Sequence, residues 1–138
     1  MNHEMFDVWA KMADAVFEES QKMGKSISFA IVENHGNLLY FKRCPESRIH
    51  TITLATNKAF TAGVMHRDTH TVATLAQPGG SLFGVNTADP RFVIIGGGLM
   101  LTLNGKVVGG VGVSGAAVEE DMHLAQKAVD KFNELMAQ

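Results

Sequence analysis

Apolar residues recur every three or four positions in several long segments of the chain, which is the spacing of one helix face. Near the start this pattern begins at Met5 and runs to Gly24, a glycine placed to end a helix. The same spacing predicts three further helices: 48–64, 69–76 and 118–136. In the last of these, acidic residues come early and lysines later, an order that suits the helix dipole.

Shorter apolar, β-rich segments between the helices predict about five strands: 26–33, 38–42, 92–95, 99–103 and 106–113. Turn residues at His35-Gly36-Asn37 and Asn104-Gly105 connect two pairs of these strands as hairpins. Asn-Gly favours a type I′ turn, because both central residues of that turn have positive φ. Hairpins indicate an antiparallel sheet, and the helices must cover its faces. We therefore predict one α+β domain over residues 1–138.

The strand predicted over residues 106–113 has little side-chain bulk on one face. Alternate residues of a strand share a face, so Val108, Gly110, Gly112 and Ser114 lie together. A face this bare indicates that another backbone, a helix or a flat ligand approaches closely. The sequence alone leaves open which of these fills the space.

Composition narrows the classes of protein that fit this pattern. Of the 138 residues, 46% are hydrophobic and 19% are charged, and the net charge is −2. This composition is globular, and without a basic excess we expect no nucleic-acid partner and no membrane binding. No apolar run reaches the roughly 18 residues of a membrane-spanning helix, and the start has no signal-peptide pattern. With Cys44 as the single cysteine, this predicts a cytoplasmic location.

Several segments, taken in chain order, resemble one known family. They are Glu33-Asn34-His35-Gly36, the strand at 38–43, Asn57-Lys58-Ala59-Phe60, Gly96-Gly97-Gly98, the glycine-bare strand and Glu119-Glu120-Asp121. Their order resembles the GlcG/HbpS-like family over essentially the whole chain. Thr69-His70 and the later segment 77–84 are most similar to the branch found as the C-terminal domain of PduO-type corrinoid adenosyltransferases.

The resemblance implies a profilin-like fold, an antiparallel sheet with helices on its faces, and assembly into homo-oligomers. It also implies haem binding and a link to corrinoid-dependent diol, glycerol or glycolate utilisation. The adenosyltransferase catalytic domain is absent, so that activity is not expected. Two turns depart from the family pattern: Glu33-Asn34-His35-Gly36 replaces Asp-Ala-Gly-Gly, and Gly115-Ala116 replaces a glycine pair.

His70 is the histidine that the resemblance singles out, as the expected axial ligand of haem iron. A neutral imidazole is a good haem ligand. The alternative is a histidine at the helix surface or one that bonds a neighbouring carbonyl. His66 lies four residues earlier, but a new helix beginning near Arg67-Asp68 would separate the two histidines. We expect the others to be solvated: His3, His35, His50 and His123.

The remaining candidate ligand contacts are expected to surround the haem. Phe83 and the region from Gly110 through Gly112 and Ser114 to Gly115 are predicted to form a flat apolar wall. Lys58 or Arg43 would meet the propionates, and Lys58 could instead pair with another carboxylate. Lys58 otherwise reaches solvent or bonds the end of the sheet, and Arg43 otherwise is exposed. For Glu119, Glu120 and Asp121, the helix dipole is a sufficient explanation.

Three hypotheses of function follow. The first is a haem- or tetrapyrrole-binding protein that is non-catalytic or accessory. The second is an enzyme or accessory factor for a small hydroxy acid, diol or corrinoid metabolite, although no acid–base constellation is visible. The third is an oligomerisation module whose bare glycine face serves only subunit packing.

Overall fold

The computed structural model describes residues 4–137. Their elements are α1 (Met5–Met23), β1 (Ser28–Glu33), β2 (Leu38–Arg43), α2 (His50–Met65), α3 (Thr69–Leu75), α4 (Val85–Ala88), β3 (Gly98–Leu103), β4 (Lys106–Ser114) and α5 (Val118–Met136). The order agrees with the sequence-based prediction, except that α4 is added and one strand is missing. No helix within the described residues has the length and apolar character needed to cross a membrane.

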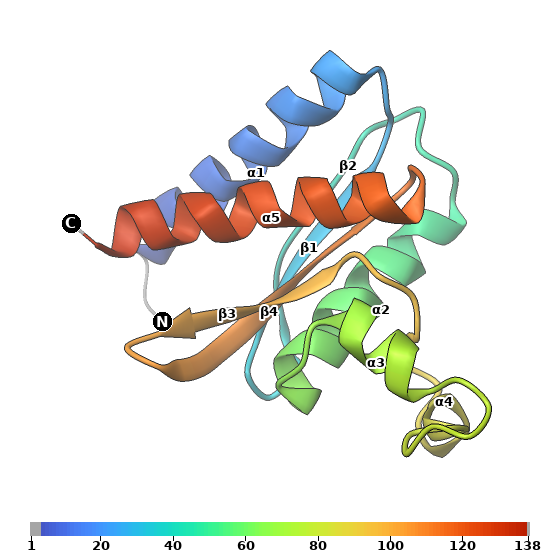
Figure 1. The fold of residues 1–138 in the computed structure, drawn as a ribbon. Coiled ribbons are helices and arrows are strands. Elements are labelled where there is room, and N and C mark those ends of the chain that lie inside the picture. Colours follow the sequence, from blue (N-terminus) through green and yellow to red (C-terminus); the bar gives the residue numbers. More distant parts are fainter. Residues whose placement is uncertain (1–3, 138) are drawn as a thin grey trace.

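A four-stranded antiparallel sheet in the order β2-β1-β4-β3 forms the middle layer. Figure 1 shows α1 and α5 side by side on one face, with α2 on the other face and α3 beside it. Two hairpins make the sheet, as predicted. In the β3–β4 turn, Asn104 and Gly105 have φ of 53° and 78°, the positive values that a type I′ turn requires. The α+β prediction is confirmed.

The main hydrophobic core lies between the sheet and the α1–α5 layer. Its largest fully buried side chains come from both helices and from β1 and β3, and include Met12, Phe29, Ile31, Leu101 and Phe132. Burying each such side chain contributes roughly 1.5–3 kcal/mol. The periodicity of the two terminal helices therefore identified the apolar faces that form this core.

Small residues form the contact between α2 and the other face of the sheet. A Cβ atom added at Gly112 would lie 2.1 Å from the carbonyl oxygen of Ala55, and one at Gly110 would lie 2.4 Å from that of Ala59. The α2 backbone thus occupies the space that these glycines leave. This corrects the expectation that Gly110 and Gly112 form the wall of a ligand site, because a helix already covers them.

Two local predictions were wrong. The segment 92–95 is not a strand, since the backbone N–H of Val93 donates to Thr61 Oγ1 of α2 at 2.9 Å instead of pairing within the sheet. In β4 the register with β3 shifts between Gly109 and Val107. This bulge changes the strict alternation of faces, and Val108 packs against the α1–α5 core.

Candidate functional site

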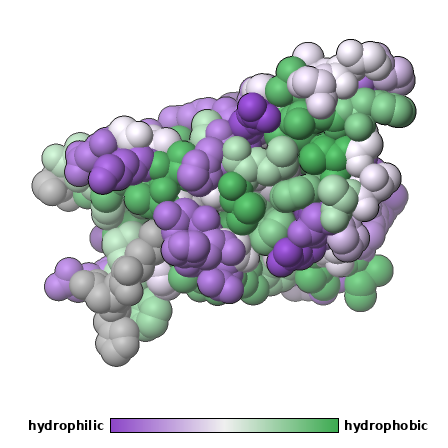
Figure 2. Space-filling model, turned by 90° about the horizontal axis from the view of Figure 1, so that it is seen from below, coloured by the Kyte–Doolittle hydropathy of each residue, from purple (hydrophilic) through white to green (hydrophobic). Residues whose placement is uncertain are grey.

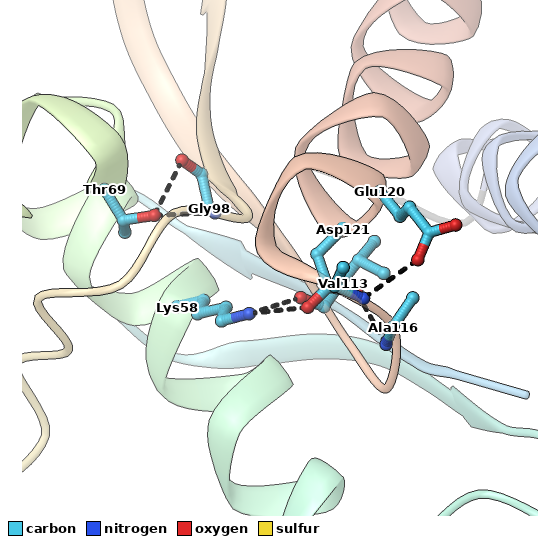
Figure 3. Close-up of polar contacts among 8 residues, drawn as sticks. Lys58, Thr69, Gly98, Val113, Ala116, Glu120 and Asp121 are labelled. Carbon is cyan, nitrogen blue, oxygen red and sulfur yellow. Dashed lines mark hydrogen bonds and ion pairs between the residues drawn. The ribbon is translucent and has the colours of Figure 1, made fainter. Parts of the chain in front are cut away.

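A buried ion pair joins three elements near one end of the sheet. Lys58 is 2% exposed, and its Nζ donates to Asp121 Oδ2 at 3.1 Å and to the carbonyl oxygen of Val113 at 2.9 Å. Figure 3 shows Lys58 extending from α2 towards the end of β4 and the start of α5. The prediction that Lys58 bonds the end of the sheet is confirmed, and the alternative that it reaches solvent is wrong.

Burial perturbs both members of this pair. Desolvation lowers the pKa of Lys58, and the charge and hydrogen bond of Asp121 oppose that shift. Desolvation likewise raises the pKa of Asp121, while Lys58 and the backbone N–H of Ala116 oppose it. Each residue therefore supports the charged form of the other at this buried position.

The acidic residues at the start of α5 have specific partners as well as a favourable place in the helix dipole. Asp121 Oδ1 accepts a hydrogen bond from the N–H of Ala116 at 3.0 Å, and Glu120 Oε1 accepts one from the N–H of Ala117 at 3.0 Å. These contacts set the turn between β4 and α5. Sequence reasoning explained the acids by the dipole alone and missed the buried role of Asp121.

A cleft of about 540 Å³ opens beside this ion pair. We name it the Lys58 cleft; its lining includes residues from α2, from the end of β4 and from the start of α5, among them Lys25, Arg48, His50, Thr51, Leu54, Lys58, Ile95, Ser114, Gly115, Val118 and Asp121. Its size is in the usual range of small-molecule sites. Of the predicted ligand contacts, Lys58, Ser114 and Gly115 meet here.

Buried hydroxyl groups lie next to the cleft. Thr51 Oγ1 is 2.9 Å from Ser28 Oγ and 2.6 Å from Ser47 Oγ, and it donates to the carbonyl oxygen of Arg48. Ser28 lies opposite Ser114 in the β1–β4 register, so both side chains point to the α2 face. The sequence carried no signal for the contact between Ser28 and Thr51, because these residues lie 23 positions apart on different elements.

Five predicted contacts lie outside the Lys58 cleft lining: Gly110 and Gly112, which α2 covers, and His70, Phe83 and Arg43. His70 is in the first turn of α3, whose Thr69 Oγ1 accepts a hydrogen bond from the N–H of Gly98 at 2.8 Å (Figure 3). The ring Nδ1 of His70 is buried and has no hydrogen-bond partner within residues 4–137. Arg43 is exposed at the end of β2, and its Nη2 donates to the carbonyl oxygen of Ser47 at 2.6 Å.

An apolar surface accompanies α3 and α4. Figure 2 shows hydrophobic residues gathered on the right of the face seen from below, where these two helices lie. Phe83, just before α4, is 66% exposed. The predicted apolar contact of the haem site is therefore on a surface separate from the glycines of β4, which α2 covers.

The other histidines have varied surroundings. The α2 helix ends at Met65 and α3 begins at Thr69, so His66 and His70 do not share a helix face. His35 Nδ1 is 3.0 Å from Glu33 Oε2 in the β1–β2 turn. His50 is exposed, as predicted, and it also lines the Lys58 cleft, which was not predicted. His3 lies outside the described residues.

Comparison with known proteins assigns the chain to a family. The model of the HbpS-like family, described as haem-degrading protein HbpS-like, matches residues 6–130. The chain belongs to the HbpS-like family. The GlcG/HbpS-like resemblance drawn from the order of the segments is thereby confirmed.

Relatives of this HbpS-like chain include proteins of Citrobacter freundii and Salmonella typhimurium. A 15.0 kDa protein of the dhaT–dhaS intergenic region of Citrobacter freundii is 42% identical over 91% of this chain and 89% of the relative. The corrinoid adenosyltransferase PduO of Salmonella typhimurium is 34% identical over 89% of this chain, which spans only 37% of that protein. A crystal structure of a PduOC:haem complex is 31% identical, with a TM-score of 0.87 over 95% of this chain and 94% of that one.

Proposed function

We propose that this HbpS-like protein binds haem. The observation that carries the proposal is the match, over nearly the full length of both chains, to a structure described as a PduOC:haem complex. The family description, which names haem-degrading HbpS, points to the same ligand. The chain spans only 37% of the PduO relative, and we propose a binding or accessory role.

His70 fits the requirements of an axial ligand. Its Nδ1 is a buried polar atom without a partner, and neither ring nitrogen forms a hydrogen bond within the described residues. An imidazole that is free of other bonds is available for ligation. When bound, haem would supply an iron centre that accepts such a ligand, and the apolar surface with Phe83 would contact its ring.

The other predicted contacts differ in whether they are accessible to haem. Gly110 and Gly112 are covered by α2, so we no longer propose them as contacts. The guanidinium of Arg43 is exposed and has donors left after its one bond to Ser47, so it remains a candidate for a propionate. Lys58, Ser114 and Gly115 lie together in the Lys58 cleft.

Titration with haemin tests the proposal. We expect a shift of the Soret band with the wild type, and loss of that shift, or a change to a weaker ligand's spectrum, with His70→Ala. His66→Asn is the matched control, because His66 is an exposed histidine with φ of 56°, which asparagine tolerates. An unchanged haemin spectrum with the wild type would overturn haem binding. A His70→Ala spectrum equal to that of the wild type would overturn ligation by His70 alone.

We further propose that the protein forms homo-oligomers, acts in the cytoplasm and supports corrinoid-dependent diol or glycerol utilisation. The PduO relative and the relative from the dhaT–dhaS region support the metabolic link. The exposed edge strand β2 supports self-association, since Leu38 on it is 53% exposed.

A further inference from the structure

The base of the Lys58 cleft holds a hydroxyl group without a partner. Ser114 is 3% exposed and lines the cleft, and its Oγ forms no hydrogen bond within residues 4–137. The neighbouring hydroxyls of Ser28, Ser47 and Thr51 are bonded to one another, so they do not satisfy it. Ser114 Oγ is not among the fully enclosed polar atoms that lack a partner within the described residues, so it faces the space of the cleft. Something that enters the cleft is therefore expected to bond it.

The ammonium group of Lys58 offers a second donor at the same place. An ammonium carries three N–H donors. Val113 and Asp121 accept two hydrogen bonds from Nζ, and no described residue accepts the third. Lys58 also lines the cleft. The base thus presents one charged donor and one hydroxyl donor to an occupant.

The charged residues of the cleft lining balance, with Lys25, Arg48 and Lys58 against Glu46, Glu120 and Asp121. The local pairing of each residue therefore decides which charge an occupant meets, and Glu46 accepts a hydrogen bond from the thiol of Cys44. Glu120 is engaged with the N–H of Ala117 and lies 3.6 Å from the Nζ of Lys25, and Asp121 is paired with Lys58. Arg48, which is exposed, forms no ion pair within the described residues. The arginine charge is therefore left without a protein partner at the opening.

Apolar side chains complete the lining. Leu54, Ile95 and Val118 contribute to the cleft, and Ile95 and Val118 are 42% and 41% exposed. An occupant with an anionic end and a short apolar chain would cover these side chains while it meets the two donors. A carboxylate matches this arrangement, since it has two acceptor oxygens and forms strong charge-assisted bonds with an ammonium group.

We propose that the Lys58 cleft binds a short aliphatic carboxylate, with its oxygens bonded to Lys58 Nζ and Ser114 Oγ. The proposal does not depend on haem binding. The carboxylate group could come from a free organic acid or from the propionate arm of a tetrapyrrole, and the experiment below distinguishes these two sources.

Calorimetric titration with butanoate tests this site, with butanamide as the neutral probe of the same size. We expect saturable binding of butanoate, at least tenfold weaker binding of butanamide, and roughly tenfold weaker binding of butanoate to Ser114→Ala, which loses one charge-assisted bond. Ser81→Ala is the matched control, because Ser81 is exposed and outside the cleft. Absence of butanoate binding to the wild type, or equal binding to Ser114→Ala, would overturn the proposal.

The Lys58 signal provides a second measurement that needs no substitution at this buried residue. In protein labelled with ¹⁵N-lysine, butanoate should shift the Nζ resonance of Lys58 and leave that of the exposed Lys106 unchanged. Butanoate that binds without moving the Lys58 resonance would contradict the proposed contact. Haemin is then added: displacement of butanoate assigns the carboxylate to a tetrapyrrole propionate, and simultaneous binding assigns it to a free acid.

Discussion

At the scale of single residues, the most consequential feature is a charged pair that the protein keeps away from water. Lys58 and Asp121 have side chains that are 2% and 4% exposed. Replacing a whole buried pair by apolar residues is often tolerated, whereas removing one partner leaves an uncompensated buried charge. This asymmetry makes the pair testable through one member at a time.

Asp121→Asn should destabilise the fold by about 3–5 kcal/mol near neutral pH, because Lys58 loses its counter-charge. The pKa of Lys58, already lowered by burial, should fall further, since Asp121 is the group that raises it. Between that lowered value and the ordinary lysine pKa, the unfolded state binds more protons than the folded state, so the free energy of unfolding rises with pH. The deficit of Asp121→Asn relative to the wild type should therefore shrink at about pH 9.5.

Urea unfolding at the two pH values measures this deficit. Glu119→Gln serves as the control, because Glu119 is an exposed acid of the same helix turn and should change stability little at either pH. A deficit that stays constant between the two pH values would show that Lys58 does not release its proton in the variant.

At the scale of elements, glycine and alanine let α2 lie directly against β4. The carbonyl groups of α2 lie where side chains of β4 would otherwise stand, at Gly110 and Gly112. This contact puts Lys58 of α2 within reach of the Val113 carbonyl and of α5. The bare strand face is therefore a packing feature that positions the ion pair and one side of the Lys58 cleft.

Gly112→Ala should lower the free energy of unfolding by about 3 kcal/mol, because its Cβ meets backbone that cannot move independently. Gly96→Ala is a matched control, since its added Cβ would meet Met122 Sδ at 2.9 Å and Val118 Cγ1 at 3.1 Å, both of them side-chain atoms. We expect a loss of about 1 kcal/mol there. Equal losses in urea unfolding would mean that the α2 backbone adjusts as readily as a methionine.

At the scale of the whole molecule, the three layers separate the apolar core from the buried polar groups and the cleft. The α1–α5 layer and the sheet hold the large apolar core, whereas the α2 side carries the buried polar groups, the cleft and, through α3, His70. Figure 1 shows that β2 and β3 form the two edges of the sheet. Edge strands have unpaired backbone groups and are ready places for association of copies.

Light scattering after size exclusion should give a mass that is a multiple of 14.9 kDa. Leu38→Lys on β2 should lower that mass, because it places a charge at an exposed apolar position of the edge. Thr102→Lys on β3 is the matched substitution at an exposed position of the other edge strand and should leave the mass unchanged. A wild-type mass of 14.9 kDa at high concentration would overturn the proposed oligomer.

The sequence by itself determined the features that depend on neighbouring residues. The helix faces of α1 and α5, the Gly24 C-cap with φ of 68° and the Asn104-Gly105 turn follow from local spacing and from conformations that few residues adopt. The order of short motif segments, among them Asn57-Lys58-Ala59-Phe60 and Gly96-Gly97-Gly98, was also enough to indicate the HbpS-like family. Local patterns carry this information because helix and strand periods repeat within a few residues.

Only the tertiary structure decided what these elements bring together. Lys58 and Asp121 are 63 positions apart, and no local pattern marks them as partners. Segment 92–95 has the apolar composition of a strand, but its backbone bonds to Thr61 on α2. The position of Ser114 was also decided by the tertiary structure, because its hydroxyl lines the Lys58 cleft only where α2 and α5 come together. Such contacts depend on the packing of distant segments, where free energy of burial and the available hydrogen-bond partners select one arrangement.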